Sequence, residues 1–357
     1  MTMTANDQPP NAPLRWAVLG TGSIAATFAQ DIMLTANAKL VAVCSRTQEA
    51  ATAFSQRFGG LRIIAGIDSL AADPLIDAVY LATPNTAHFD QARILMMAGK
   101  PVLIEKPVTM TAAQARSLAG LSAQYQCFAM EGMWPLFLPA FARMRELLAR
   151  DTIGTITAVH AELAYTKAVD GNSRFFSQAL GGGALLDLGV YPIALTLALF
   201  GFPRKVTGQW QEASTGVDMS ATISLGYDGF KASLSCGFDR IGSNRFIIEG
   251  KTGCLVIDGP FLRANRIVLT RNRMAHHLAL PPGSSRLSRA FGKIARALPL
   301  PGLTVHKYGF PGDGLQFEIE AASTAILEGR REETRIPLSA SAEALGIIET
   351  ILDQPPS

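Results

Sequence analysis

The stretch LRWAVLGTGSIA at residues 14–25 decides the fold of this chain. Its apolar first half predicts a buried strand, and the two glycines that follow allow a tight turn and a close approach of the backbone to a pyrophosphate. A helix is expected from Ile24, and its first N–H groups and its dipole would favour a phosphate there. We therefore predict a dinucleotide site, whose contacts in this stretch are Gly20, Gly22, Ser23 and Ile24. A tight turn without a ligand is the alternative.

The same alternation of strand and helix continues along the chain. Short apolar runs at 40–44, 79–82 and 102–104 alternate with helical stretches, which is the pattern of repeated βαβ units. Such units build a doubly wound parallel sheet that binds its ligands beyond the carboxyl ends of the strands. We expect an α/β fold with this domain over residues 14–130, after a disordered tail at 1–13.

After Glu131 the strands become longer and alternate apolar with small polar residues. The runs 219–225 and 230–236 both follow this period of two, and Tyr227-Asp228-Gly229 between them predicts a hairpin turn. We expect residues 131–357 to form an α+β domain with a large, mostly antiparallel open sheet whose apolar face is covered. The Ser and Thr face is either solvated or the contact surface of a homodimer, and the pattern leaves both open.

Composition limits the classes of protein to consider. The 357 residues are 48% hydrophobic and 17% charged with a formal net charge of +3, which describes an ordinary soluble protein and gives no reason to expect a nucleic-acid partner. The four cysteines show no CxxC pairing, so we expect reduced thiols in a cytoplasmic protein, with no disulfide and no metal site. The N-terminal residues lack the pattern of a secretory signal, and the apolar run 184–200 is too broken for a membrane span.

The end of the second strand, Ser45-Arg46-Thr47, indicates which dinucleotide binds. An acidic residue would normally stand here, about 20 residues after the glycines, to bond the ribose 2′-hydroxyl of NAD. No acid is present, and two hydroxyls with the planar cation of Arg46 suit the 2′-phosphate of NADP. We expect NADP, with contacts from Ser45 and Arg46. An exposed arginine and use of both NADP and NAD is the alternative.

Two further strand ends carry polar residues that suit the nicotinamide end of the cofactor. Thr83-Pro84-Asn85 follows one strand, with His88 opening the next helix, and Glu105-Lys106 closes another strand. Because the carboxyl ends of parallel strands share one edge of the sheet, we predict cofactor contacts from both segments. The predicted contacts are Thr83, Pro84, Asn85, His88, Glu105 and Lys106. A catalytic His88 is less favoured than local hydrogen bonding, and a solvated charge is the alternative for Lys106.

The stretch GGGALLDLGVYP at 181–192 joins a flexible glycine loop to a helix. Asp187 and Tyr191 are four residues apart, so an α-helix would place them on one face. An ammonium such as Lys106 beside a phenol favours the phenolate, and the pair could then move a proton. We predict Lys106, Tyr191 and Asp187 as catalytic residues. Without Lys106, Tyr191 is more simply a packed tyrosine.

Taken in order, GTGSIA, SRT, ATPNTAH, EKP and GGGALLDLGVYP resemble the motifs of the Gfo/Idh/MocA family of oxidoreductases, over about residues 14–352. The resemblance implies an N-terminal Rossmann domain and a C-terminal α/β domain whose open sheet often mediates dimers. It also implies oxidation or reduction of sugars and related hydroxy compounds with NAD(P). Tyr191 and the run Glu131-Gly132-Met133-Trp134 are similar to the branch that contains dimeric dihydrodiol dehydrogenase and NADP-dependent D-xylose 1-dehydrogenase.

The resemblance assigns the family's motif lysine to Lys106, and it implies hydride transfer between NADP and a carbinol or carbonyl carbon of a sugar, polyol or cyclic diol. Leu136 stands where the branch usually has an arginine near its substrate, which leaves the usual substrate open. The predicted substrate contacts are Trp134, Phe175, Asp187 and Tyr191. A non-catalytic NADP-binding sensor or regulatory protein of the same fold is the alternative function.

One segment stands out by charge. Residues 259–312 hold nine Lys or Arg residues and no acidic residue. Such a run suits a solvated insertion, and an anionic surface, phosphate or acidic partner is the alternative.

Overall fold

The computed structural model describes residues 12–272, 274 and 300–357. The chain forms two compact units, each assembled from separate stretches of sequence. The first unit holds residues up to 134, 179–181 and 311–346, and the second holds 135–178, 182–310 and 347–357. Most of the predicted tail at 1–13 and the middle of the basic segment lie outside the described residues.

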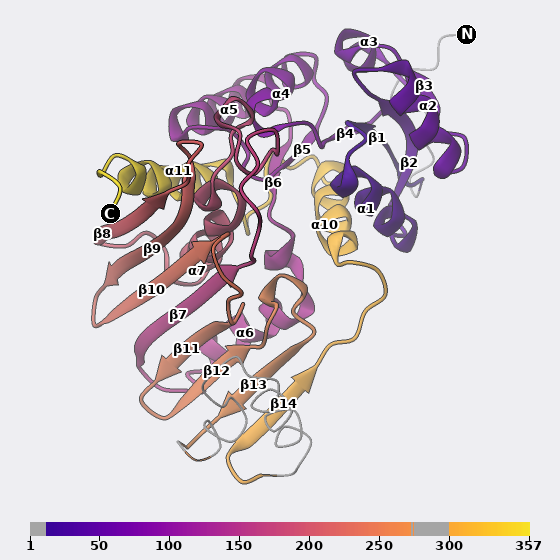
Figure 1. The fold of residues 1–357 in the computed structure, drawn as a ribbon. Coiled ribbons are helices and arrows are strands. Elements are labelled where there is room, and N and C mark those ends of the chain that lie inside the picture. The colour runs from indigo at the N-terminus through magenta and orange to yellow at the C-terminus, as the bar shows by residue number, and fades with distance from the viewer. Residues whose placement is uncertain (1–11, 273, 275–299) are drawn as a thin grey trace. The chain divides into compact units, whose positions relative to one another are not determined.

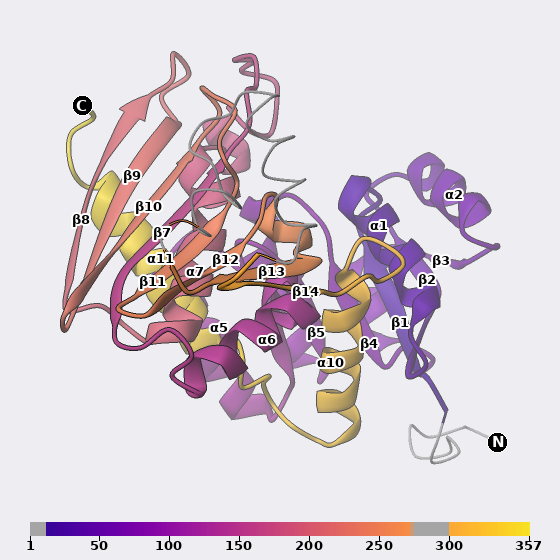
Figure 2. The ribbon, with the colours of Figure 1, turned by 90° about the horizontal axis from the view of Figure 1, so that it is seen from below.

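The first unit is built on a parallel sheet of six strands (Figures 1 and 2). The strands are β1 (Leu14–Leu19), β2 (Ala38–Cys44), β3 (Arg62–Ile64), β4 (Ala78–Leu81), β5 (Val102–Glu105) and β6 (Ala129–Gly132). Their order is β3-β2-β1-β4-β5-β6, and every neighbouring pair is parallel. The winding direction reverses between β1 and β4, and such sheets bind ligands in the crevice beyond the strand ends at this point. The predicted doubly wound sheet is confirmed.

Helices connect these strands and cover the sheet. They are α1 (Ser23–Asp31), α2 (Gln48–Arg57), α3 (Ile67–Ala72), α4 (His88–Met97) and α5 (Ala112–Tyr125), with short 3₁₀ turns η1 (Ile32–Leu34) and η2 (Asn85–Ala87). Strands β4 and β5 are buried along their whole length, as expected for a sheet with helices on both faces. The ring of Phe28 on α1 stacks on that of Tyr80 on β4 with centroids 4.0 Å apart, which fixes α1 against the sheet.

The chain returns to the first unit near its end, through α10 (Leu315–Leu327). The indole N–H of Trp16 on β1 donates to the Ser323 hydroxyl at 3.0 Å. The buried carboxylate of Asp31 accepts the backbone N–H groups of Gly314 and Leu315, both at 2.9 Å, and so satisfies the first donors of α10. This return differs from the expected division at residue 130. Its cause is a capping acid that lies far from the helix in sequence.

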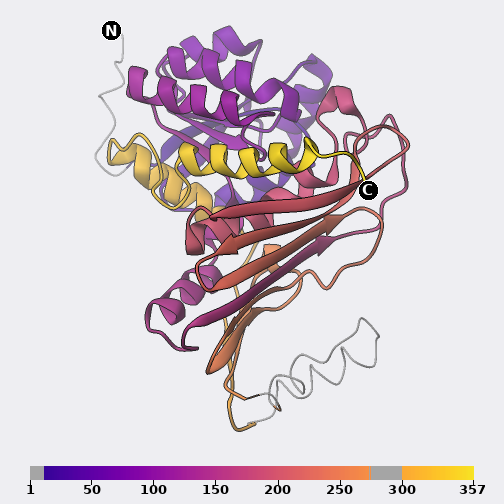
Figure 3. The same cartoon turned by 90° about the vertical axis from the view of Figure 1, so that its left-hand side faces the viewer.

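The second unit is built on an eight-stranded sheet, which Figure 3 shows as a broad twisted surface. The strands are β7 (Ile156–Ala164), β8 (Lys205–Glu212), β9 (Asp218–Tyr227), β10 (Phe230–Gly237), β11 (Phe246–Gly250), β12 (Gly253–Ile257), β13 (Arg266–Thr270) and β14 (Leu303–Lys307). Their order is β14-β13-β12-β11-β7-β10-β9-β8, with β7 and β10 parallel and the other pairs antiparallel. The predicted, mostly antiparallel sheet is confirmed.

The helical elements of the second unit are few. They are η3 (Trp134–Phe137), which begins at the last residue of the first unit, α6 (Pro139–Ala149), a π-helical turn η5 (Leu185–Gly189), α7 (Val190–Phe200) and η6 (Phe261–Arg263). Two elements divide between the units, η4 (Gln178–Leu180) and α11 (Leu338–Leu352). The helical stretch Gln178–Phe200 is long and apolar enough to cross a membrane, but 83% of its apolar window is buried, as in a core helix.

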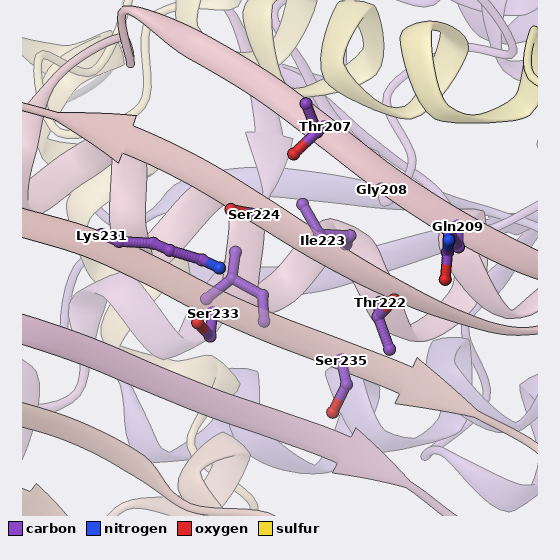
Figure 4. A pocket seen from close by; sticks show the side chains of 10 residues that line it. Thr207, Gly208, Gln209, Thr222, Ile223, Ser224, Lys231, Ser233 and Ser235 are labelled. Carbon is purple, nitrogen blue, oxygen red and sulfur yellow. The ribbon is translucent and has the colours of Figure 1, made fainter.

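The two faces of the second sheet differ as the sequence predicts. Ala221, Ile223 and Leu225 are at most 3% exposed, whereas Thr222 between them is exposed. Tyr227 pairs with Phe230, so the turn is the predicted hairpin. The polar face carries a shallow hollow of about 430 Å³, where Figure 4 shows threonine and serine side chains of β8, β9 and β10. This hollow holds none of the predicted site residues.

Candidate active site

The glycine turn after β1 has the geometry of a phosphate cradle. Gly20 has φ +111°, and a Cβ there would lie 2.4 Å from the carbonyl oxygen of Ala82, so only glycine fits. Gly22 and Ser23 are exposed at the start of α1. No side chain caps this helix start and no acid lies in its first turn, so its N–H groups suit an anion. The turn fits the pyrophosphate of a dinucleotide.

The end of β2 supplies the residues that were predicted to choose the cofactor. The Ser45 hydroxyl lies 3.2 Å from that of Thr21, which ties the segment to the glycine turn. Thr47 is engaged as the cap of α2, since its hydroxyl accepts the backbone N–H of Ala50 at 3.3 Å. Arg46 is exposed and has no hydrogen bond or ion pair to any residue that the structure describes. Its guanidinium therefore keeps all its donors for a ligand.

The loop after β4 is fixed by its own polar side chains. Thr83 donates to the Gln91 side chain at 2.6 Å, and Pro84 precedes the turn η2. The amide of Asn85 donates to the carbonyl of Gly181 at 3.2 Å, within the same unit. Asn85 thus holds the glycine loop in place, a contact that the sequence did not suggest.

His88 is completely buried, with Nδ1 2.8 Å from the carbonyl of Pro107 and Nε2 2.9 Å from the carbonyl of Thr83. Burial lowers the pKa of His88, and the two carbonyls act in the opposite direction. Both ring nitrogens of His88 face backbone oxygens inside the protein, and the predicted cofactor contact of His88 stays a prediction. His88 joins the loop after β4 to the segment that carries Lys106.

Lys106 follows directly after β5 and is half-buried, at the same edge of the sheet as the end of the paired strand β4. Glu105 before it is 8% exposed, and its carboxylate accepts a hydrogen bond from the Tyr80 hydroxyl. The side chain of Glu105 is held within the sheet layer, and its predicted cofactor contact stays a prediction. Lys106 remains the residue of this pair that a cofactor or substrate could reach.

A group of buried acids lies near this strand end and was not predicted. Glu318 on α10 is fully buried, and neither carboxyl oxygen has a hydrogen-bond partner among the described residues. Burial raises its pKa well above the usual value, and the nearby acids Glu105, Asp31 and Glu131 raise it further. Both effects favour the protonated, neutral form of Glu318. Its helix lies more than 200 residues after β5 in sequence, so no local pattern could reveal the group.

In the second unit the glycine loop starts the helix of Asp187 and Tyr191. Gly183 has φ +123°, and a Cβ there would lie 2.1 Å from Oδ1 of Asp218. Oδ2 of Asp218 accepts the backbone N–H of Leu185 at 2.6 Å, which caps the helical start. Burial raises the pKa of Asp218 to about 6, although backbone N–H groups partly offset the effect. Asp218 lies on β9 and was not foreseen as part of the site.

Asp187 and Tyr191 are 8% and 6% exposed. The predicted α-helical start is wrong in one detail: residues 185–189 form a π-helical turn that passes into α7 at Val190. Such turns are rare and occur often at functional sites. Oδ1 of Asp187 lies 3.4 Å from Nη1 of Arg174, whose side chain is mostly exposed.

The predicted pocket residues divide between the units. Trp134, 9% exposed, ends the first unit, and Phe175, half-buried, belongs to the second. Lys167 Nζ lies 3.8 Å from the centroid of the Phe175 ring, and Arg174 Cζ lies 4.2 Å from it. Leu136 is 2% exposed, so it is a core residue. Among the described residues, no group of three or more His, Cys, Asp or Glu has the arrangement of a metal site.

Comparison with known proteins places this geometry in a family. Residues 14–133 match the model described as "Oxidoreductase family, NAD-binding Rossmann fold", and residues 141–256 match the GFO/IDH/MocA C-terminal domain. The chain belongs to the Gfo/Idh/MocA family of oxidoreductases. It is therefore an NAD(P)-dependent oxidoreductase, and the predicted family is confirmed.

Curated relatives within the Gfo/Idh/MocA family are dehydrogenases. The chain is 31% identical over 245 residues to trans-1,2-dihydrobenzene-1,2-diol dehydrogenase of Mus musculus, across 67% of this chain and 73% of that protein. It is 27% identical over 343 residues to the Homo sapiens protein of the same name, across 95% and 96% of the two chains. It is 29% identical over 364 residues to D-xylose 1-dehydrogenase (NADP(+)) of Hypocrea jecorina, across 96% and 92%.

Solved structures share the fold at lower identity. Aldose-aldose oxidoreductase from Caulobacter crescentus, complexed with glycerol, has a TM-score of 0.80 at 21% identity, across 96% of this chain and 97% of that one. KijD10, a 3-ketoreductase from Actinomadura kijaniata in complex with NADP and TDP-benzene, has a TM-score of 0.79 at 22% identity, with the same coverage. These two likenesses confirm the fold class.

Proposed function

We propose that this protein transfers a hydride between NADP and a carbinol or carbonyl carbon of a sugar, polyol or cyclic diol. The observation that carries the proposal is the glycine turn, where Gly20 leaves no room for a Cβ and α1 offers uncapped N–H groups. Its relatives named above act on a dihydrodiol and on D-xylose. A dihydrodiol and D-xylose both offer a carbinol carbon to a dehydrogenase, which supports the same reaction class for this chain.

NADP is favoured over NAD by Arg46. Its guanidinium is exposed and unpaired among the described residues, and a planar cation binds a phosphate through two parallel hydrogen bonds. Ser45 adds a hydroxyl on the same segment. Bound NADP would supply the hydride chemistry, and the protein would supply orientation and proton transfer.

Three side chains would act on the substrate, and two of them would take part in proton transfer. Tyr191 accepts the proton of the substrate hydroxyl as general base, and Lys106 hydrogen-bonds the same reacting oxygen and favours the phenolate. Asp187 orients the substrate. The supporting observations are the half-buried Lys106 at the end of β5 and the nearly buried Asp187 and Tyr191 on the capped turn of the second unit.

The test is a screen that follows NADPH absorbance with aldoses, inositols and dihydrodiols, repeated with NAD. We expect turnover with at least one hydroxy compound and a preference for NADP. Tight NADP binding without turnover of any compound in the panel would favour the sensor alternative over an enzyme, since this fold can bind a nucleotide without catalysis.

The quaternary state and location form the last part of the proposal. The Ser and Thr face of β8, β9 and β10 is polar with a shallow hollow, and we propose that it forms the interface of a homodimer (Figure 4). The four cysteines are buried and free, which suits a reducing cytoplasmic compartment.

A further inference from the structure

We propose that Lys167 and Arg174 form a subsite for an oxyanion of the substrate, so that the preferred substrate is a sugar or polyol with a carboxylate or phosphate group. The inference rests on the proposed hydride transfer and narrows its substrate class. It starts from two cations on one aromatic ring: Lys167 Nζ and Arg174 Cζ lie 3.8 Å and 4.2 Å from the centroid of Phe175.

The positive charge of this cluster is only partly compensated. Lys167 has no carboxylate within ion-pair distance in the part of the chain that the structure describes. The carboxylate partner of Arg174 there is Asp187, at 3.4 Å, which is long for a charge-assisted hydrogen bond. Two cations against one carboxylate leave a net positive charge, and each cation gains only weakly from the ring at an open site.

Neighbouring carboxylates are already engaged elsewhere. Asp170 accepts the backbone N–H of Asn172 at 2.9 Å in its own turn. On the strands beside Phe238, Arg240 pairs with Asp239 at 2.8 Å and with Glu162 at 3.1 Å. None of these three carboxylates forms an ion pair with Lys167 or Arg174 among the described residues, so both cations stay accessible to an anionic ligand.

The cluster is built on fixed backbone. The N–H of Lys167 donates to the carbonyl of Phe238 at 2.9 Å, and the N–H of Gly183 donates to the carbonyl of Phe175 at 2.9 Å. The Phe175 ring packs edge-on against Phe238, with centroids 5.7 Å apart. A Cβ at Gly182 would lie 2.8 Å from the Phe175 carbonyl oxygen, so the glycine lets the two segments touch. The platform is set before any substrate arrives.

The position of the cluster connects it to the chemistry. Arg174 contacts Asp187, and Asp187 shares a continuous helical segment with Tyr191. A substrate whose reacting hydroxyl lies at Tyr191 would extend along Asp187 toward the two cations. The ammonium of Lys167 and the planar guanidinium of Arg174 together suit the oxygens of a carboxylate or a phosphate.

The test compares kcat/KM for three sugars that share one ring and one anomeric centre: glucose, glucuronate and glucose 6-phosphate, with NADP. We expect kcat/KM for at least one of the two anions to exceed that for glucose by about tenfold, because the neutral sugar lacks a charge-assisted hydrogen bond to the two cations. The two anions separate a carboxylate from a phosphate. Rising salt should reduce the advantage of the anion.

Variants test whether the preference for an anionic substrate depends on Lys167 and Arg174. Lys167→Gln and Arg174→Gln should each lower kcat/KM for the preferred anion about tenfold more than for glucose, and Lys167→Arg should restore most of the loss. Lys251→Gln, at an exposed turn between β11 and β12, is the matched control and should change neither. Equal losses on glucose and on the anion would overturn the subsite.

A second measurement covers the case in which none of the three sugars reacts. Gluconate and inorganic phosphate should then compete with the best substrate of the screen, and Lys167→Gln should raise their inhibition constants about tenfold; absence of competition overturns the subsite. If neutral compounds are turned over but anions are neither preferred nor inhibitory, the subsite proposal is wrong and the proposed function still stands. Absence of turnover with every compound contradicts the proposed function itself.

Discussion

At the scale of single residues, the proposed chemistry depends on Lys106 and Tyr191. General acid–base catalysis contributes on the order of 10²–10⁴ in rate, so Lys106→Met and Tyr191→Phe should each reduce kcat by about that range. NADP binding, followed by fluorescence titration, should stay within about threefold, because the cradle around Gly20 is untouched. Near-normal turnover in either variant would remove that residue from proton transfer.

A separate prediction concerns Arg46 and the preference for NADP over NAD. Arg46→Ala should lower kcat/KM for NADP by about 10- to 100-fold and change the value for NAD little, because only the 2′-phosphate loses a charge-assisted contact. Arg116→Ala, an exposed arginine on α5, serves as control for loss of one positive charge. If both cofactors lose equally, Arg46 does not recognise the 2′-phosphate.

The raised pKa of Glu318 leads us to predict that the stability of the protein depends on pH. Its pKa is raised in the folded protein, so its favourable contribution is present below the unfolded-state pKa and is lost as pH rises toward the folded value. Glu318→Gln cannot ionise, so relative to wild type its free energy of unfolding should rise between pH 5 and pH 9 by roughly 1–3 kcal/mol. Urea unfolding at several pH values measures this.

The control for that experiment is Glu343→Gln, an exposed acid on α11, which should follow the wild-type pH profile. A constant difference between Glu318→Gln and wild type at all pH values would contradict a raised pKa of Glu318. Among the described residues, the charged groups that act on Glu318 are Glu105, Asp31 and Glu131, and all three raise its pKa.

At the scale of elements, the capped turn that carries Asp187 and Tyr191 is sensitive to one methyl group. Gly183→Ala combines a left-handed φ with a Cβ placed 2.1 Å from Asp218, whereas Gly229→Ala has φ +85° and open space. Both variants carry backbone strain of roughly 1–3 kcal/mol, but only Gly183→Ala also meets Asp218. Its free energy of unfolding in urea should therefore fall clearly more than that of Gly229→Ala, and its kcat should also fall. Equal losses in the two variants would mean that the Asp218 cap tolerates displacement.

At the scale of the whole molecule, the polar face of the second sheet predicts association. We expect a mass near twice 38.1 kDa in light scattering. Ser233 lies opposite Ser224 on this face, so Ser233→Glu should place a charge in the contact and shift the mass toward one chain. Lys251→Glu in the exposed turn should leave the mass unchanged. A single-chain mass for the wild type would contradict the proposed dimer.

The order of elements followed from local sequence. Apolar runs of strand length, glycines at 20 and 22 and the alternation at 219–225 are local signals, and the structure confirms the parallel and antiparallel sheets that they predict. The same signals located Lys106 at a strand end and Asp187 with Tyr191 on one helical segment. Chain periodicity and turn chemistry act over a few residues, so a single sequence displays them.

Only the tertiary structure decided which distant residues support these sites. The cap of α10 by Asp31, the cap of the π-helical turn by Asp218 and the burial of Glu318 each join segments far apart in the chain. His88 and Glu105 fit cofactor contacts by their place after strands, yet the fold surrounds their side chains with protein. Burial and hydrogen bonding depend on what packs around a side chain. The sequence determined the helices and strands and which polar residues follow them. Packing decided which of those side chains stay accessible to a ligand and which are enclosed by the protein, because burial depends on segments far apart in the chain.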